Sequence, residues 1–138
     1  MRHEATGNSK SFYSRLPPLA CCLLPGVAMK IIKVKEALRH LEKLNEEVRY
    51  ISCVEGRRFS TGLISFRPRK DSDPKQIKHR DKDVLCHVIR GSGRLRVNGR
   101  RISLKPGTIC HIPRGTPHDF AAGGNRELVL FYSLITTG

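Results

Sequence analysis

The sequence predicts one all-β domain that carries a single short helix near its N-terminus. Its 138 residues suit one domain of common size and leave little room for a second. From residue 48 onward, short apolar and β-branched runs recur, separated by turns that contain Gly, Pro or Asn. No alternation of strands with long helical patterns interrupts this series. The pattern therefore indicates a β-sandwich or β-barrel.

Residues 1–28 differ in composition from the rest, and we expect them to be a disordered or non-native extension ahead of a domain at 29–138. A secretory signal is the alternative, but three prolines interrupt its apolar stretch. Residues 29–34 predict a short edge strand. Leu38, Leu41 and Leu44 then form one stripe among charged residues, which predicts an amphipathic helix over 36–47.

The remaining chain predicts eight strands joined by short turns and one long charged connection at 67–83. Asn98-Gly99 indicates a two-residue hairpin, because both positions require a positive φ. The last strand shows little polar alternation, which predicts burial on both faces and a homodimer contact. The strands are expected at Val48–Glu55, Phe59–Phe66, Val84–Ile89, Leu95–Val97, Ile102–Leu104, Thr108–Ile112, Pro117–Ala121 and Arg126–Ile135.

The chain is strongly basic, with 26 Lys and Arg against 12 Asp and Glu and a net charge of +14. This balance favours an anionic partner. The densest basic cluster has no set of aromatic residues on which bases could stack, which disfavours nucleic acid. We therefore expect a small anionic molecule, bound by Arg69, Lys78 and Arg80. No apolar run reaches the ~18 residues that a membrane span requires, so no membrane partner is expected.

The chain has five cysteines but no Cys-x-x-Cys pair. Cys53, Cys86 and Cys110 lie inside apolar runs, which predicts buried, reduced thiols that behave as small hydrophobic side chains. Reduced thiols are typical of a reducing compartment, so the sequence favours a cytoplasmic protein.

Two segments that carry histidines have a recognisable spacing. One runs from His79 to Gly91, and the other is Gly107-x5-Pro113-x-Gly115-x2-His118. The segment from His79 resembles the first motif of the cupin superfamily, H-x-H-x(3,4)-E-x6-G. The segment from Gly107 resembles the second, G-x5-P-x-G-x2-H. The resemblance covers about residues 48–135 and implies a double-stranded β-helix, or jelly-roll, barrel.

Cupins that hold a divalent metal typically use three histidines and a glutamate inside the barrel. The resemblance places His79 and His118 at two of these positions, and Ile77 and Val84 at the other two. Water or a weaker candidate could complete such a centre: His111, Asp83 or Gln76. Imidazole with oxygen ligands suits Fe, Mn, Ni or Zn.

Strand alternation predicts which side chains can reach the interior. If Val84 faces inward, every second side chain as far as Val88 does so too, and His87 faces outward. His87 is therefore not expected at the site. The same pattern does not assign His111 to the inward or the outward face.

Three functions follow from these observations. The first is a metal-dependent enzyme, such as an oxygenase, isomerase or decarboxylase, that acts on a small anionic substrate. The second is a non-catalytic ligand-binding or sensing module that needs no metal or other cofactor. The third is a basic protein associated with nucleic acid. The sequence has no phosphate-binding loop and no strand-to-helix nucleophile turn, which argues against nucleotide-binding and hydrolase functions.

Overall fold

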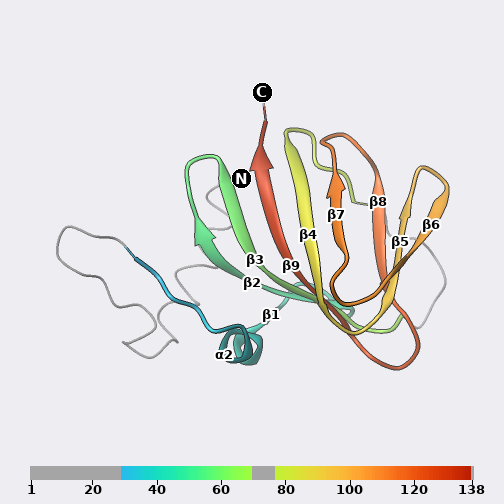
Figure 1. Ribbon diagram of the computed structural model, residues 1–138, viewed down its shortest axis with the longest axis horizontal. Helices are drawn as coiled ribbons and strands as arrows, with labels where there is room; N and C mark the ends of the chain where they lie inside the picture. Colours follow the sequence, from blue (N-terminus) through green and yellow to red (C-terminus); the bar gives the residue numbers. More distant parts are fainter. Residues whose placement is uncertain (1–28, 70–76, 138) are drawn as a thin grey trace.

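The computed structural model describes residues 29–69 and 77–137, and antiparallel strands make up most of them (Figure 1). A short helical segment precedes the strands. In chain order the elements are α2 (Val34–Ala37), the 3₁₀ helix η2 (Leu38–His40), β1 (Glu42–Lys43), β2 (Val48–Glu55), β3 (Phe59–Phe66), β4 (Lys82–Arg90), β5 (Gly93–Val97), β6 (Arg100–Leu104), β7 (Ile109–Ile112), β8 (His118–Ala122) and β9 (Leu128–Thr136).

The strands form two antiparallel sheets. The larger has six strands in the order β1-β2-β3-β9-β4-β7, and the smaller has three in the order β6-β5-β8. Neighbours in each sheet are often distant in sequence, as β3 and β9 are. This arrangement confirms the expected all-β jelly roll, and each of the eight predicted strands is present with ends shifted by two residues at most.

The predicted hairpin turn joins β5 to β6. Asn98 has a φ of 51° and Gly99 a φ of 74°, so both residues adopt the left-handed conformation that a two-residue hairpin requires. Asparagine and glycine tolerate this conformation better than other residues. Local turn chemistry therefore determines the register of these two strands.

The main hydrophobic core lies between the two sheets. The predicted alternation along β4 is confirmed, since every second residue from Val84 to Val88 is buried in this core and His87 is exposed. The buried members of the core are Val48, Phe66, Val84, Cys86, Val88, Leu95, Leu104, Cys110, Ile112, Phe120, Leu128 and Leu130.

The predicted helix over 36–47 is wrong in extent. Helical structure covers only 34–40, after which Leu41 is extended, with ψ of 135°, and Glu42 pairs with Tyr50 of β2. The three leucines of the stripe pack against different surfaces. Leu38 and Leu41 pack under the larger sheet, whereas Leu44 lies at a pocket between the sheets. Residues 29–33 also form no strand.

A second, smaller core lies on the outer face of the larger sheet, beneath the helical segment. Its buried residues are Ala37, Ile51, Cys53 and Leu63. Cys53, Cys86 and Cys110 are buried and form no disulfide, as expected. Burial raises the pKa of Cys53 to about 11 and that of Cys86 to about 12, so both thiols are protonated at neutral pH.

The last strand, β9, is buried on both faces only in its first part. Leu128, Val129 and Leu130 are at most 1% exposed, whereas Phe131 is 37% exposed on the outer face. The homodimer contact expected from this strand stays a prediction. Residues 1–28 lie outside the described part of the chain. Within the described ranges, no helix has the length and apolar character needed to cross a membrane.

Candidate functional site

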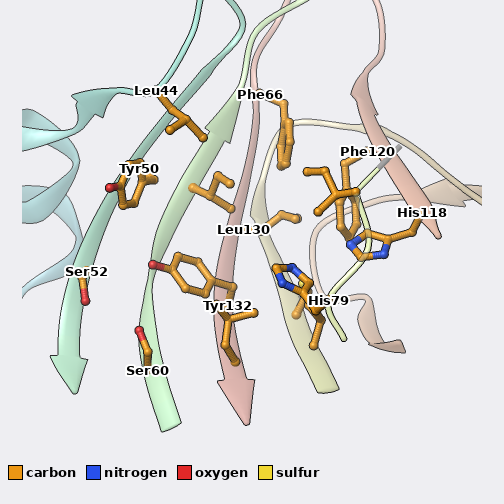
Figure 2. A pocket seen from close by; sticks show the side chains of 15 residues that line it. Leu44, Tyr50, Ser52, Ser60, Phe66, His79, His118, Phe120, Leu130 and Tyr132 are labelled. Carbon is orange, nitrogen blue, oxygen red and sulfur yellow. The ribbon is translucent and has the colours of Figure 1, made fainter. Parts of the chain in front are cut away.

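A pocket of about 290 Å³ opens between the two sheets. Figure 2 shows its polar side chains in two groups, with histidines on one side and hydroxyl groups on the other. Its lining is Leu44, Tyr50, Ser52, Ser60, Ile64, Phe66, Ile77, His79, Val84, Cys86, His118, Phe120, Leu130, Tyr132 and Leu134.

His79 and His118 face each other across the histidine side of this pocket, with ring centroids 5.8 Å apart. His118 begins β8, and His79 lies in the segment before β4. Two backbone hydrogen bonds between Ile77 and His118 hold that segment beside β8, at 2.7 and 2.9 Å. The structure thus brings together the two histidines that the sequence analysis selected.

The turn of one motif positions the histidine of the other. Gly115 has a φ of 79°, and its N–H donates to the carbonyl oxygen of His79 at 2.6 Å. A residue with a side chain is strained in this conformation, whereas glycine is not. The Pro113-x-Gly115 spacing therefore serves to fix the backbone of His79 as well as to start β8.

One hydrogen bond determines the tautomer of His118. Its Nδ1 lies 2.9 Å from the carbonyl oxygen of Thr116, and a carbonyl can only accept. Nδ1 therefore carries a proton, and the Nε2 of the neutral ring has a lone pair available to a ligand. The side chain is only 3% exposed and contacts the ring of Phe120 edge-on.

His79 is kept neutral. Burial lowers the pKa of its imidazole below the usual range, and the electrostatic effects of His118 and Lys82 lower it further. The carboxylate of Asp81 opposes this shift. At neutral pH the imidazole of His79 is thus uncharged.

The opposite side of the pocket carries hydroxyl groups. Tyr50, Ser52, Ser60 and Tyr132 project there from β2, β3 and β9. Burial raises the pKa of Tyr132, so its hydroxyl keeps its proton and can donate. Apolar side chains such as Phe66 and Leu130 make up much of the remaining lining. The pocket can therefore hold a molecule that is polar at its ends and apolar between them.

Lys82 is a buried cation next to this pocket that the sequence analysis missed. It is 3% exposed and precedes Val84 by two residues, so its side chain shares the inward face of β4. Its ammonium acts on the imidazole of His79. The signal was present in the sequence, because the alternation from Val84 extends backwards to Lys82.

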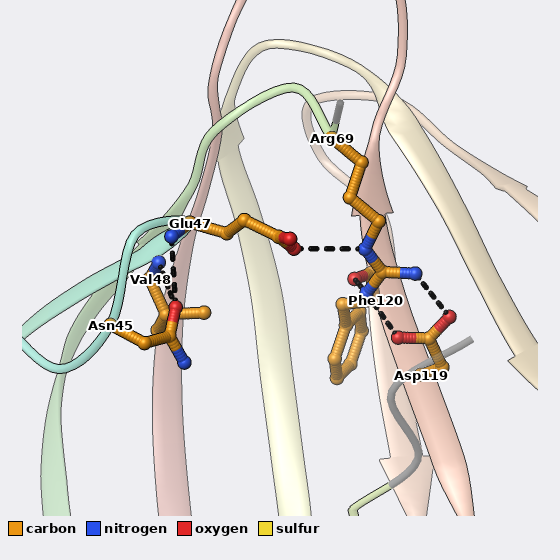
Figure 3. Close-up of polar contacts among 6 residues, drawn as sticks. All are labelled: Asn45, Glu47, Val48, Arg69, Asp119 and Phe120. Carbon is orange, nitrogen blue, oxygen red and sulfur yellow. Dashed lines mark hydrogen bonds and ion pairs between the residues drawn. The ribbon is translucent and has the colours of Figure 1, made fainter. Parts of the chain in front are cut away.

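Arg69 does not serve as the expected anion ligand (Figure 3). Its guanidinium donates to both carboxylate oxygens of Asp119, to Glu47 at 2.9 Å and to the carbonyl of Phe120 at 3.2 Å. These carboxylates neutralise it and raise its pKa further. The contacts join the loop before β2, the segment that follows β3, and β8. Arg69 is thus a structural cation.

The other predicted basic ligands, Lys78 and Arg80, are exposed. They flank His79 in sequence, and neither is among the residues that line the pocket. In an extended segment neighbouring side chains point to opposite sides, so Lys78 and Arg80 point away from the side to which His79 points. They contribute to the basic surface near the pocket without reaching into it.

The weaker metal-ligand candidates do not approach the histidine pair. His111 Nε2 and a carboxylate oxygen of Asp83 lie 2.9 Å apart, and both side chains belong to the outer face of the larger sheet. The other carboxylate oxygen of Asp83 accepts the backbone N–H of Arg114 at 3.0 Å. Gln76 lies outside the described residues.

A resident divalent metal does not fit this set of side chains. Such metals are usually held by three or more protein ligands. Over residues 29–69 and 77–137, no group of three His, Cys, Asp or Glu side chains is suitably placed. Apolar Ile77 and Val84 line the pocket where the resemblance implies two further ligands. Lys82 adds a positive charge beside His79, which disfavours a second cation.

Comparisons with solved structures show the fold to be a known one. A predicted oxalate decarboxylase from Thermotoga maritima has a TM-score of 0.66 and 16% identity, over 78% of this chain and 99% of that chain. The TT1209 protein of Thermus thermophilus has a TM-score of 0.61 and 21% identity, over 78% of this chain and 98% of that chain.

The cupin domain of Cnp3 from Schizosaccharomyces pombe has a TM-score of 0.59 and 15% identity. That alignment covers 65% of this chain and 61% of the yeast one, so the match spans less than two thirds of that relative. At such identities the likeness concerns the fold alone.

No curated protein matches the chain. The family model of the cupin domain matches residues 62–134, which is more than half of the 138 residues. The match includes both histidines of the pocket and most of the strands around it. The chain belongs to the cupin domain family.

Proposed function

We propose that this protein is a ligand-binding cupin whose pocket takes a small molecule with an apolar body and a hydrogen-bonding end. The observation that carries the proposal is the division of the pocket lining. Two imidazoles lie at one side, hydroxyl groups lie at the other, and apolar side chains make up the rest of the lining. Concave, mostly apolar sites with a few convergent polar groups are typical of small-molecule binding.

The binding requires no resident metal in this proposal. His118 Nε2 can accept a hydrogen bond from the ligand, and the hydroxyl of Tyr132 can donate one from the opposite wall. Apolar contact with Phe66 and Phe120 contributes the rest of the affinity, because burial of apolar surface is favourable in water.

A metal-dependent enzyme is the second candidate, and one observation favours it. The hydrogen bond from His118 Nδ1 to a backbone carbonyl is the arrangement that orients many metal-binding histidines. The lack of a third ligand beside His79 and His118, among the residues that the structure describes, is the argument against it. The two candidates therefore differ in a measurable property, the metal content of the protein.

Metal analysis separates the two. The protein is purified from medium supplemented with Fe, Mn, Ni and Zn, together with His79→Ala and His118→Ala variants. We expect less than about 0.2 equivalents of any metal in all three proteins, since a preformed site would be close to saturation. One equivalent in the wild type that is lost in both variants would refute the metal-free proposal and favour the second candidate.

Ligand binding tests the proposal directly, with 3-phenylpropanamide as a neutral probe that has an apolar body and a hydrogen-bonding end. We expect NMR titration in the presence of EDTA to shift the signals of His79 and His118. An Ile64→Trp variant should lose binding, because the larger side chain fills the pocket. Phe59→Trp adds the same side chain at an exposed site of the same strand and should retain it. A titration without shifts would refute the proposal.

A further inference from the structure

Lys82 is the least expected residue of the interior. Lysine is among the residues that are almost never fully buried without a partner. Lys82 nevertheless has only 3% of its surface exposed. It lies at the start of β4, opposite Thr136 of β9. The next pair on the same face of the sheet is Val84 and Leu134, and both of these residues line the pocket. Lys82 is not itself a lining residue, but unlike the exposed Lys78 and Arg80 it is buried, and its side chain enters the interior beside the pocket.

The ammonium of Lys82 lacks the acceptors that burial normally demands. Among the described residues its one ion-pair partner is Asp81, at 3.8 Å, which is too long for a hydrogen bond. The side chain of Asp81 is itself 66% exposed and therefore well solvated. A buried ammonium has three N–H donors, and leaving them without acceptors costs free energy. The structure thus contains a buried cation whose natural acceptor is a further anion.

His79 shows on which side that anion would bind. Lys82 shares the inward face of β4 with Val84, which lines the pocket together with His79, and its charge lowers the pKa of the His79 imidazole. His118 lies across from His79, at the ring separation described above. An acidic group that enters the pocket beside His79 would meet the ammonium of Lys82, which is a donor, whereas Nε2 of His118 is an acceptor and suits a different group of the ligand.

We propose that Lys82 binds the carboxylate of the pocket's ligand, which makes that ligand a monocarboxylate with an apolar body. This inference rests on the proposed function and adds to it the charge of the ligand and the residue that recognises it. The carboxylate accepts hydrogen bonds from the Lys82 ammonium, and the apolar body packs against Phe66 and Phe120.

Charge balance favours a carboxylate over a phosphate. Lys82 supplies one full positive charge beside the pocket wall, and burial holds the imidazole of His79 in its uncharged form at neutral pH. Arg69 has its own carboxylate partners, and Lys78 and Arg80 are exposed to solvent. A single ammonium matches a monoanion, whereas a phosphate dianion would keep an uncompensated charge in a largely apolar pocket.

The test compares two probes that share one skeleton, 3-phenylpropanoate and 3-phenylpropanamide, on wild-type protein and on Lys82→Met. Methionine keeps most of the length of the side chain and removes its charge. Lys78→Met is the matched control, because it removes the same charge from an exposed position in the segment just before β4. Thermal unfolding of each variant checks that it is folded, and NMR titration measures the affinities.

We expect Lys82→Met to weaken binding of the carboxylate by at least about tenfold and binding of the amide by clearly less, because the charge-assisted hydrogen bond to a carboxylate is the stronger one. Lys78→Met should alter neither affinity by more than about twofold, as a solvent-exposed charge contributes little. Equal carboxylate affinity in wild type and Lys82→Met overturns the inference while amide binding still supports the pocket. An equal loss for both probes also overturns it, because Lys82 would then act on the pocket's shape. Binding of neither probe to wild type refutes the proposed function itself.

Discussion

Arg69 and Lys82 are two cations held away from solvent in the same sandwich, and their surroundings differ in one respect. The side chains are 12% and 4% exposed. Arg69 is surrounded by the carboxylates of Glu47 and Asp119, which accept its hydrogen bonds at 2.5–2.9 Å. Lys82 has only the solvated carboxylate of Asp81, at 3.8 Å, among the residues that the structure describes.

The difference shows that burial of a charge does not by itself reveal its role. A buried cation whose donors are satisfied within the chain supports the fold, because removing it would leave its carboxylates uncompensated. A buried cation without acceptors within the chain lowers stability and can be retained for a ligand. The same distinction separates the anion-binding expectation for Arg69 from the role that we infer for Lys82.

The largest expected effect is on the stability contributed by Arg69. Arg69→Met should lower the free energy of unfolding by about 3–5 kcal/mol, because it removes the buried cation that contacts both Glu47 and Asp119. Arg67→Met removes an exposed arginine two residues away and should change the free energy of unfolding by less than about 0.5 kcal/mol. Chemical denaturation measures both. Similar small changes in the two variants would mean that the Arg69 contacts contribute little.

A smaller effect of opposite sign is expected for Lys82. Lys82→Met should leave the free energy of unfolding unchanged or raise it by about 1 kcal/mol, since an apolar side chain replaces a buried ammonium that lacks acceptors. The measurement is the same denaturation experiment, in the absence of ligand. A loss of stability near that of Arg69→Met would remove the contrast between the two cations.

The smallest effect concerns His79, and it depends on pH. The pKa of His79 is lowered in the folded protein, so below pH 6.5 the unfolded chain binds more protons than the folded one. Stability should therefore fall as the pH drops through 6.5, by at most about 1.4 kcal/mol per pH unit, and level off below the folded pKa. Denaturation curves measured at several pH values above and below 6.5 give the dependence of stability on pH. His79→Gln should make this dependence weaker. His87→Gln, on the outward face, should retain it.

The strands and turns were predictable because their signals are local. Alternation along β4 correctly indicated which of its residues face the core. Asn98-Gly99 indicated the hairpin, and Gly115 indicated the turn before His118. The helix over 36–47 was mispredicted because the leucine stripe is also compatible with a short turn followed by an edge strand. Only pairing with β2 decides between these two structures.

Sequence alone determined the all-β architecture, the inward face of β4 and the two histidines worth bringing together, since turn residues and side-chain alternation act over a few neighbouring positions. Tertiary structure decided which charged side chains have a partner of opposite charge within hydrogen-bond distance. Arg69 meets carboxylates from positions 47 and 119, His111 meets Asp83 on the outer face, and Lys82 meets no close acceptor among the described residues. These outcomes depend on side chains that are far apart in the chain and become neighbours only when the two sheets pack.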